Sequence, residues 1–263
     1  MDLSIIIVNY KSKEKTLNCI QSIKESDLDN LKYEIIVVDN ASQDDSQKII
    51  TLQYPEINFI QSEKNLGMGG GNNLGIKQSQ GEFILILNPD TTVKKDAIKT
   101  LYEYIKNNKQ AGIVGPKLLN TDNTLQYSCW RFPIFYNPIF SRTIIGKLFP
   151  KIFNNFTMKD FDHASIRQVD WITGACMMIR SNILSKIGKG FDEHFFMYFE
   201  DTDLCRMMRK IDYKVIYCPH AIVMHEHQQQ SMKMPWYISP FLNKPAREHI
   251  KSWIKYFWKY RKL

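Results

Sequence analysis

The chain has 263 residues, 44% of them hydrophobic, which is enough for one large domain with a full core, or one domain with an appendage. Its five cysteines include no Cys-x-x-Cys pair, which argues against a disulfide framework or a cysteine zinc site and favours a reducing, cytoplasmic compartment. A net charge of +8 favours an anionic partner: nucleic acid, phosphates or an acidic membrane surface. There is no signal-peptide pattern and no apolar run of membrane-spanning length, so we expect a protein that is not integral to a membrane.

Short apolar runs alternate with helical patterns over the first part of the chain. The runs at 3–8 and 34–38 are continuous, which is typical of strands buried on both faces of a sheet. This alternation predicts a parallel sheet covered by helices. Strands are expected at 3–8, 34–38, 57–61 and 83–87, and helices around 17–23, around 46–52 and after the glycine-rich segment 65–75.

Polar residues follow three of these strands. Asn9 follows the first, Asp39 and Asn40 follow the second, and the sequence Asn-Pro-Asp at 88–90 follows the fourth. In open α/β sheets, ligands bind outside the carboxyl ends of the strands. The three strand ends therefore predict one polar crevice.

The glycine-rich segment 65–75 has two interpretations. It matches neither the P-loop pattern nor the Gly-x-Gly-x-x-Gly dinucleotide fingerprint after the first strand. Small residues before a helix allow backbone N–H groups to meet an anion. The alternative is a tight turn with close helix packing, and the sequence leaves both open.

Beyond about residue 112 the pattern changes. Residues 130–162 are aromatic and basic, contain three prolines and show no clean period, so we expect a partly helical excursion over the active face. Short strands are expected at 113–114, 117–119 and 214–217, and a core strand at 169–180.

The stretch 191–208 (FDEHFFMYFEDTDLCRMM) joins an aromatic run to the carboxylates of Glu200, Asp201 and Asp203. The apolar residues that follow have the spacing of a helix packed on one side. An apolar wall raises the pKa of a carboxyl group, and a helix N-terminus stabilises negative charge, so the stretch suits a general base. The alternative is that Asp201 only caps the helix.

Asp90 and His225 are the candidate metal ligands. Mg²⁺ in proteins typically takes one or two carboxylates plus substrate phosphates, and Asp90 lies at a strand end. His225 and His227 flank Glu226, which is not the His-Glu-x-x-His spacing of zinc proteases. Because a lone histidine is more often structural than a ligand, both roles stay open for His225 and His227.

The last segment, from residue 246, predicts a basic amphipathic helix, with Pro245 suited to its first turn. Its expected apolar stripe is Ile250, Trp253, Ile254, Phe257 and Trp258, and its lysine face is Lys251, Lys255, Lys259 and Lys262. Such a pattern is typical of an interfacial membrane helix. The alternative is a C-terminal helix that packs its apolar face on the domain.

A set of short motifs runs in order from residue 4 to about 230. These are 4–10 (SIIIVNY), 37–42 (VVDNAS), 65–67 (NLG) with 71–73 (GNN), 87–90 (LNPD), 171–175 (WITGA), 190–196 (GFDEHFF) and 200–205 (EDTDLC). Each is weak alone. Together they resemble the family 2 glycosyltransferases of the GT-A fold, and most closely their bacterial rhamnosyltransferase-like branch.

The resemblance implies an α/β, GT-A fold: a Rossmann-like, mostly parallel central sheet flanked by helices, followed here by the C-terminal amphipathic helix. It implies a nucleotide-diphosphate sugar donor, a divalent metal (Mg²⁺ or Mn²⁺) and inversion at the anomeric carbon of the sugar. Asp201 corresponds to the general base, with Glu200 as a supporting neighbour and Asp203 as helix-start charge. Asp90 corresponds to the last acid of the Asp-x-Asp metal motif, with His225 as the second candidate ligand.

Further site residues are carried over by position. Those expected to bind the donor nucleotide are Asn9, Asp39, Asn40, Asn65, Gly67, Asn73 and Asp90. Those expected to shape the sugar and acceptor pocket are Trp171, Gly174, Ala175 and Phe199. Two departures from the family pattern matter: Asn88 stands in place of a carboxylate, and Gly67-Met-Gly stands in place of Gly-Phe-Ala.

We therefore expect an inverting glycosyltransferase that acts on a hydroxyl of a lipid-linked cell-surface glycan. The expected donor is dTDP-rhamnose, with a UDP-hexose or UDP-galactofuranose as alternatives. An inactive membrane-surface adaptor of the same fold is the non-enzyme alternative, against which the retention of Asp90 and Asp201 argues. A sugar nucleotidylyltransferase would carry a glycine-rich basic loop after the first strand, where residues 9–12 are NYKS instead. A nucleic-acid binder is disfavoured because the basic residues gather at the tail.

The expected organisation is one glycosyltransferase domain over 1–240, with a nucleotide-binding half (1–112) and an acceptor and catalytic half (113–240). Residues 241–263 form the basic helix. That helix would hold the enzyme on the cytoplasmic face of the cell membrane as a peripheral protein. The oligomeric state, including a homodimer, stays open.

Overall fold

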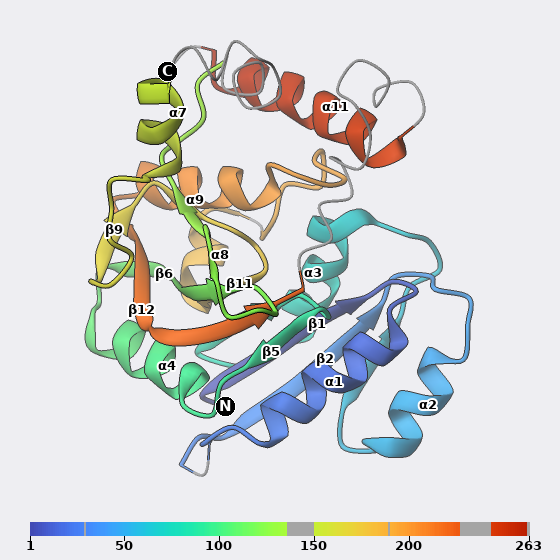
Figure 1. Ribbon diagram of the computed structural model, residues 1–263. Helices are drawn as coiled ribbons and strands as arrows, with labels where there is room; N and C mark the ends of the chain where they lie inside the picture. The colour runs from blue at the N-terminus through green and yellow to red at the C-terminus, as the bar shows by residue number, and fades with distance from the viewer. Residues whose placement is uncertain (29, 136–149, 189, 227–242, 262–263) are drawn as a thin grey trace.

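The computed structural model describes residues 1–28, 30–135, 150–188, 190–226 and 243–261, and Figure 1 shows a central sheet with helices on both of its faces. The strands are β1 (Leu3–Asn9), β2 (Tyr33–Asp39), β3 (Asn58–Gln61), β4 (Phe83–Leu87), β5 (Thr91–Val93), β6 (Ala111–Leu119), β7 (Leu125–Gln126), β8 (Cys129–Trp130), β9 (Arg167–Val169), β10 (Trp171–Ile172), β11 (Cys176–Arg180) and β12 (Lys214–His225). The helices are α1 (Lys13–Lys24), α2 (Ser46–Gln53), α3 (Gly67–Gln78), α4 (Ala97–Asn107), α7 (Pro150–Thr157), α8 (Ser181–Lys186), α9 (Glu200–Lys210) and α11 (Lys244–Lys259).

The main sheet has the strand order β3-β2-β1-β4-β11-β6-β12-β5, with β7 beside β6 and β9 beside β12. Strands β3, β2, β1 and β4 are parallel, as expected from the alternation of strands and helices. Strand β11 is antiparallel to both of its neighbours, while β12 is parallel to β6. The sheet is therefore mixed, with a parallel half built from the first part of the chain.

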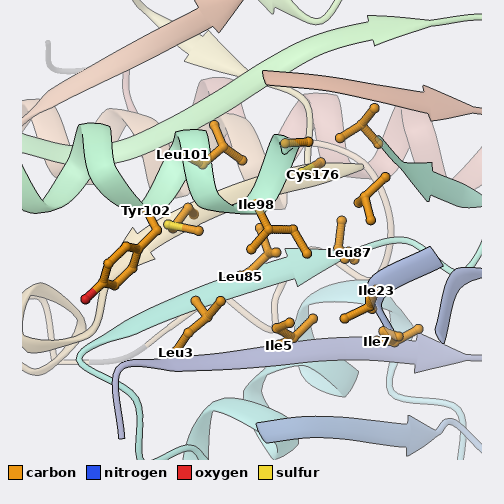
Figure 2. Packing of buried hydrophobic residues seen from close by; sticks show 14 of the residues in the cluster. Leu3, Ile5, Ile7, Ile23, Leu85, Leu87, Ile98, Leu101, Tyr102 and Cys176 are labelled. Carbon is orange, nitrogen blue, oxygen red and sulfur yellow. The ribbon is translucent and has the colours of Figure 1, made fainter. Parts of the chain in front are cut away.

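The two faces of β1 bury alternate side chains. Ile5 and Ile7 join the core under α1 and α4, which Figure 2 shows together with Leu85 and Leu87 of β4. Ile6 joins the opposite core, which contains side chains of α3, α8 and α9. Burying one such side chain contributes about 1.5–3 kcal/mol, so these continuous apolar runs fix the strands at the centre of the molecule.

Helix α3 begins at Gly67, so most of the glycine-rich segment lies inside the helix rather than before it. A Cβ atom on Gly75 would lie 2.5 Å from Cγ2 of Ile6, and one on Gly71 would lie 2.8 Å from Cγ1 of Val8. Gly67 has φ +73°, and a Cβ there would lie 2.0 Å from the carbonyl oxygen of Phe196. The structure thus favours the interpretation of the segment as a turn with close helix packing.

Several expected strands have different bounds. The single strand expected at 169–180 is wrong: the chain there forms β9, β10 and β11, because a turn around Gly174 interrupts it. The strands expected at 113–114 and 117–119 are one strand, β6, which continues through Pro116. Strand β12 continues past Tyr217 to His225, with irregular register between Cys218 and Ile222.

The excursion expected at 130–162 is partly helical, as α7 shows, while residues 136–149 lie outside the described part of the chain. The expected domain boundary at 240/241 and His227 also lie outside it.

Helix α11 packs on the domain, and only part of the apolar stripe that the sequence predicted takes part: Phe257 packs against Tyr256, and Trp253 packs on Phe135. Its buried side chains include Ser252, Tyr256 and the following Tyr260, which lie against the segment before α9. Two stripe residues, Ile254 and Trp258, are 55% and 69% exposed. The helix is therefore docked by Ser252 and its tyrosines together with Phe257, while Ile254 and Trp258 face outward. Among the described residues, no helix combines the length and apolar character needed to cross a bilayer.

Candidate active site

The carboxyl ends of β1 and β2 meet in a buried polar network around Asp39. Oδ1 of Asp39 accepts hydrogen bonds from Nδ2 of Asn9 (2.7 Å) and Oγ of Ser42 (2.5 Å). Oδ2 accepts from the backbone N–H of Ser42 (2.9 Å) and from Nε2 of Gln61 (2.8 Å). Four donors thus fix the carboxylate at the end of β2, and of these residues Gln61 is the exposed one.

Asn40 links the end of β2 to the start of α3. Its Nδ2 donates to Oδ1 of Asn65 (3.1 Å) and to the carbonyl oxygen of Gly67 (2.9 Å), and its Oδ1 accepts from the backbone N–H of Leu66 (2.9 Å). The backbone N–H of Met68 donates to the carbonyl oxygen of Phe196 (3.1 Å). These amides at the start of α3 are thus engaged within the protein.

Asp90 and His225 lie side by side, with Nε2 of His225 3.3 Å from Oδ1 of Asp90. Nδ1 of His225 lies 2.7 Å from Oε1 of Gln126, on β7. Nε2 of Gln126 donates to the His225 carbonyl oxygen (3.2 Å), so the amide is oriented with its oxygen toward Nδ1. Because an amide oxygen can only accept, Nδ1 donates to Gln126, and Nε2 is the ring nitrogen that faces Asp90.

Asp201 lies in the first turn of α9, partly exposed. Its Oδ2 accepts from the backbone N–H of Gly174 (2.9 Å), and its Oδ1 accepts from the backbone N–H of Thr202 (2.7 Å). Burial raises the pKa of Asp201, while these hydrogen bonds oppose the increase. The result is an oriented carboxylate with a stronger affinity for a proton than an exposed aspartate.

Glu200, next to Asp201, is 6% exposed, and its Oε2 has no hydrogen-bond partner among the described residues. Burial, and then the charge of Asp201, raise the pKa of Glu200 to about 8. The two neighbouring carboxyl groups therefore differ: Glu200 holds its proton near neutral pH, which leaves Asp201 as the group available to accept one.

Backbone contacts connect the candidate metal pair to the candidate base. The backbone N–H of Asn88, at the end of β4, donates to the carbonyl oxygen of Ala175 (2.9 Å). Ala175 follows Gly174, whose N–H holds Asp201. A Cβ atom on Gly174 would lie 3.4 Å from Cβ of Asp201 and 3.8 Å from Cε of Met68. The ends of β2 and β4, the start of α3 and the start of α9 thus border one region.

Asp201 is not the N-cap of α9. The N-cap is Phe199, which has φ 69° and follows Tyr198, which has φ 68°. Two successive non-glycine residues in the left-handed region are uncommon and cost free energy, so the surrounding structure must hold them. The capping interpretation of Asp201 is therefore wrong, and its carboxylate is oriented by Gly174 and Thr202 instead.

Three other predicted site residues make contacts that the sequence did not indicate. Asn73 bonds both the N–H and the carbonyl oxygen of Phe191, at 2.8 and 2.9 Å. Trp171 stacks on Trp130, with ring centroids 5.8 Å apart, and its Nε1 donates to the Arg131 carbonyl oxygen. Phe199 packs against Tyr256 of α11. Their substrate-binding roles stay predictions.

Sequence reasoning missed Gln126, Gln61 and the role of Asp203. Gln126 stands on a two-residue strand, for which no periodic pattern exists. Gln61 was assigned to an expected strand with no role of its own. Asp203 was predicted as helix-start charge, but it is 2% exposed and bonded to Lys259 and Tyr260 of the C-terminal segment. A buried carboxylate needs such partners, yet nothing in a single sequence indicates which lysine supplies the charge.

The family model for glycosyl transferase family 2 matches residues 4–188, well over half of the chain and including the ends of β1, β2 and β4. The chain belongs to glycosyl transferase family 2. This family 2 glycosyltransferase is 32% identical over 228 residues to the low-salt glycan biosynthesis hexosyltransferase of Haloferax volcanii, covering 85% of this chain and 67% of that protein. It is 26% identical to the N-acetylglucosaminyl-diphospho-decaprenol L-rhamnosyltransferase of Mycobacterium tuberculosis, covering 76% of this chain and 69% of that protein.

The fold of this family 2 glycosyltransferase also matches solved structures. The crystal structure of GalNAc-T7 with UDP, GalNAc and Mn²⁺ superposes with a TM-score of 0.67 at 12% identity, covering 99% of this chain and 50% of that one. The predicted GT-A fold and the rhamnosyltransferase-like relationship are confirmed. The protein is a glycosyltransferase that uses a sugar-nucleotide donor.

The raised pKa of Glu200 predicts how stability depends on pH. The unfolded chain ionises this group near its usual 4.5, whereas the folded protein does so near 8. The favourable contribution of neutral Glu200 is therefore complete below about pH 4.5 and is lost as pH rises toward 8. Glu200→Gln cannot ionise, so its free energy of unfolding should rise relative to wild type across this interval, at most by about 1.4 kcal/mol per pKa unit.

The measurement is urea unfolding of both proteins at pH 5 and pH 8.5. The control is Glu103→Gln, which changes an exposed glutamate of α4 and should show no such pH-dependent difference. A stability difference between Glu200→Gln and wild type that is the same at both pH values would contradict the assignment.

Proposed function

We propose that this glycosyltransferase transfers a sugar with inversion, using Asp201 as general base and a divalent metal held by Asp90 and His225. The observation that carries the proposal is the connection between these groups. The backbone N–H of Asn88, two residues before Asp90, donates to the carbonyl oxygen of Ala175. The backbone N–H of Gly174, the residue before Ala175, donates to the Asp201 carboxylate. A metal-binding pair and an oriented base thus border one region at the carboxyl ends of the strands, where α/β sheets bind ligands.

The residues at Asp90 and His225 suit a hard divalent cation. A carboxylate oxygen lies beside an imidazole Nε2, and Gln126 keeps the other ring nitrogen protonated. The described residues hold no group of three or more His, Cys, Asp or Glu side chains that could bind a metal, so donor phosphates and water would complete the coordination. When bound, Mg²⁺ or Mn²⁺ would offset the negative charge that develops on the leaving diphosphate.

Asp201 would carry the proton transfer. An acceptor hydroxyl next to its carboxylate gives its proton to the aspartate oxygen, and the hydroxyl oxygen forms a bond to the anomeric carbon. The bond from that carbon to the nucleoside diphosphate breaks on the opposite face, and the diphosphate leaves with the bonding electrons. The N–H groups of Gly174 and Thr202 hold the carboxylate in one orientation, and the raised pKa of Asp201 makes it a better base.

We assign the nucleotide to the network around Asp39. Its carboxylate already accepts four hydrogen bonds, so an N–H of the donor base must replace one donor, and the exposed side chain of Gln61 is the one free to move. Asn9 is buried and orients Asp39, while Asn40 and Asn65 shape the turn into α3. We therefore propose that residues 1–112 bind the nucleotide and that residues 113–240 bind the acceptor.

We further propose L-rhamnose from dTDP-rhamnose as the transferred sugar and a lipid-linked glycan as the acceptor. The Mycobacterium tuberculosis relative, named as a rhamnosyltransferase acting on a decaprenol diphosphate, supports this choice. The Haloferax volcanii relative, named as a hexosyltransferase, keeps a UDP-hexose as the second candidate.

A lipid-linked acceptor lies in a membrane. The outward side of α11 has the exposed side chains that could bind the surface of that membrane. Ile254 and Trp258 are exposed, and the guanidinium of Arg261 lies 4.0 Å from the centre of a Trp258 ring. Tryptophan beside basic residues is typical of helices that bind the membrane interface. We propose peripheral attachment through this side, on the cytoplasmic face.

Replacing the base should separate chemistry from donor binding. Asp201→Asn keeps the shape of the side chain but removes its proton affinity, so transfer should fall by about 10²–10⁴-fold while donor binding stays intact. Transfer is measured with wild type against dTDP-, UDP- and GDP-sugars, and then with the variant on the best donor. Asp212→Asn, an exposed aspartate just after α9, is the matched control. Unchanged turnover in Asp201→Asn would remove Asp201 from the role of base.

Metal binding should depend on the two proposed ligands, Asp90 and His225, and on Gln126, which orients His225. Asp90→Ala and His225→Ala should abolish the difference in nucleotide affinity between Mn²⁺ and a chelator. Gln126→Leu should weaken Mn²⁺ affinity by about 10–100-fold, because it frees the orientation of His225. Calorimetric titrations of UDP and dTDP, with Mn²⁺ and with chelator, measure the nucleotide affinity, and titration of Mn²⁺ measures the metal affinity. The control is Gln47→Leu, on the exposed side of α2. If wild type binds the nucleotide equally well with Mn²⁺ and with chelator, the metal assignment is contradicted.

Membrane binding should require the exposed apolar side chains of α11. The double variant Ile254→Glu, Trp258→Glu should lose co-sedimentation with phosphatidylglycerol vesicles, since it replaces the inserting groups with charge. Leu52→Glu removes a 77% exposed leucine of α2 and should bind the vesicles like wild type. Retained binding by the double variant would show that α11 does not mediate attachment.

A further inference from the structure

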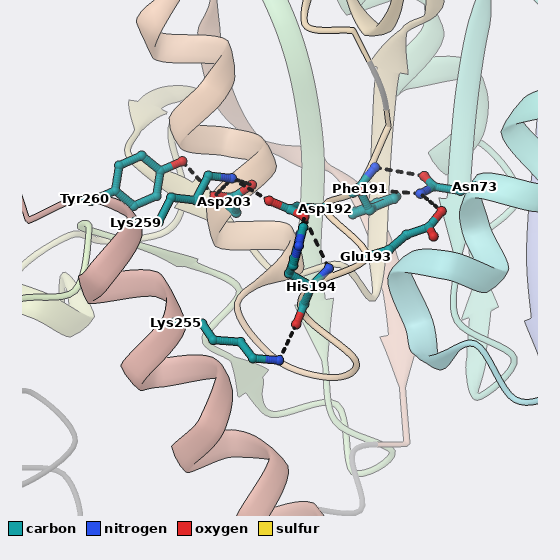
Figure 3. Close-up of polar contacts among 9 residues, drawn as sticks. All are labelled: Asn73, Phe191, Asp192, Glu193, His194, Asp203, Lys255, Lys259 and Tyr260. Atoms are coloured by element: carbon teal, nitrogen blue, oxygen red, sulfur yellow. Dashed lines mark hydrogen bonds and ion pairs between the residues drawn. The ribbon is translucent and has the colours of Figure 1, made fainter.

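The segment that precedes the proposed base lies between two helices. We call residues 191–199 the base loop; Figure 3 shows that α3 reaches its first residues from one side and α11 from the other. From α3, Asn73 bonds the backbone of Phe191. From α11, Nζ of Lys255 donates to the carbonyl oxygen of His194 (2.7 Å), and Oγ of Ser252 donates to that of Met197 (2.8 Å).

Lys259 joins the start of the base loop to α9. Its Nζ lies 2.8 Å from Oδ2 of Asp192 and 2.7 Å from Oδ1 of Asp203. The hydroxyl of Tyr260 donates to the same Oδ1 of Asp203 (2.7 Å). Asp192 and Asp203 lie on either side of Asp201 in the sequence, so a single ammonium group holds both ends of the segment that carries it (Figure 3).

The charges in this cluster are paired. Asp192 and Asp203 are 6% and 2% exposed, and buried carboxylates of this kind need a cation or hydrogen-bond donors. Burial by itself opposes a charge on Lys259, but the two carboxylates outweigh it and raise the pKa of Lys259 above its usual value. Lys259 is therefore a cation at neutral pH and stays bound to both aspartates.

The held segment contains the two residues with left-handed backbone, Tyr198 and Phe199. Such conformations persist only where the surroundings fix them. The rings of His249 and Tyr256, both on α11, lie 4.7 Å from the Tyr198 ring and 5.1 Å from the Phe199 ring, respectively. Helix α11 thus contacts the base loop at its beginning, middle and end, up to the residue before Glu200.

We infer that Lys259 is a positioning residue for transfer: by bridging Asp192 and Asp203 it fixes the base loop and the first turn of α9, and hence the place of the Asp201 carboxylate. The inference rests on the proposed role of Asp201 as base. It gives α11 a second function beside membrane attachment, because its inner side completes the active site while Ile254 and Trp258 point outward. Among the described residues, the hydrogen bonds to the Asp39 carboxylate come from Asn9, Ser42 and Gln61 and none comes from α11, so this network should be unaffected.

The test uses the full chain with Lys259→Met, which keeps the length of the side chain and removes its charge. We expect kcat to fall about 10- to 100-fold, since small displacements of a catalytic group have effects of this size. Nucleotide affinity should stay within about twofold of wild type, because Lys259 bonds Asp192 and Asp203 and not the network around Asp39. Lys259→Arg, which can bridge the same two carboxylates, should restore most of the lost kcat. Lys48→Met, which changes an exposed lysine of α2, should behave as wild type.

Hydrogen–deuterium exchange gives a readout that is independent of activity. Lys259→Met should speed exchange of the amides of residues 195–203 and leave β1 unchanged. If Lys259→Met does not fold, Asp192→Asn, which removes one arm of the bridge, should give the same pattern more weakly. A kcat within about twofold of wild type together with unchanged exchange in 195–203 would overturn the inference. Equal losses of kcat and nucleotide affinity, with no rescue by arginine, would also overturn it.

A failure of the inference can be distinguished from a failure of the proposed function. If wild type transfers no sugar from any donor, the proposed function fails, while the exchange experiment still decides whether Lys259 fixes the base loop. If wild type is active and Lys259→Met matches it in both measurements, only the inference fails.

Discussion

In-register parallel pairing of β1 with β2 and β4 is the constraint on which the site depends. Asn9 pairs with Asp39, and Ile7 pairs with Leu87, so the three strands end at the same edge of the sheet. Every polar group that follows a strand then enters the same region. The pairing is itself fixed by burial of isoleucine, leucine and valine on both faces, where a shift of one residue would turn each side chain to the wrong face. The core therefore sets where the polar residues after these strands lie.

The second half of the chain supplies the candidate base near that edge. Strand β11 pairs antiparallel to β4, and the turn before it presents the N–H of Gly174 to Asp201. Glu200 and Asp201 are adjacent, yet they differ in environment. Asp201 has backbone donors on both oxygens, whereas one oxygen of Glu200 has no partner in the described structure. This difference keeps one proton on Glu200 and leaves Asp201 basic, which is how neighbouring carboxyl groups take different roles.

The sequence was sufficient for what depends on local pattern. The apolar runs predicted β1, β2 and β4, and the motifs together predicted the family and the GT-A fold. Asp90 was named from the Asn-Pro-Asp motif and His225 as a second candidate beside His227, and Nε2 of His225 lies 3.3 Å from Oδ1 of Asp90. These features could be predicted because each depends on a few consecutive residues.

What the sequence did not indicate depends on contacts between distant residues. Gln126 holds His225 across 99 positions, and Lys259 reaches Asp203 across 56, and neither contact leaves a periodic signal. The residues through which α11 docks could not be predicted for the same reason. Its apolar stripe has helical spacing, but the partners that decide the packing, such as Phe195 and Asp203, belong to the base loop and α9. Ionic and tyrosine contacts are made there beside the half-buried Phe257.

The most direct test of the account is a crystal structure with a nucleoside diphosphate and Mn²⁺, with the metal located by its anomalous scattering. The account predicts one Mn²⁺ bound by Asp90 and Nε2 of His225 and by the diphosphate oxygens. It also predicts the base of the nucleotide beside Asp39, with the Gln61 side chain displaced. A nucleotide bound away from the carboxyl ends of β1, β2 and β4, or a Mn²⁺ ion held without Asp90 and His225, would contradict it.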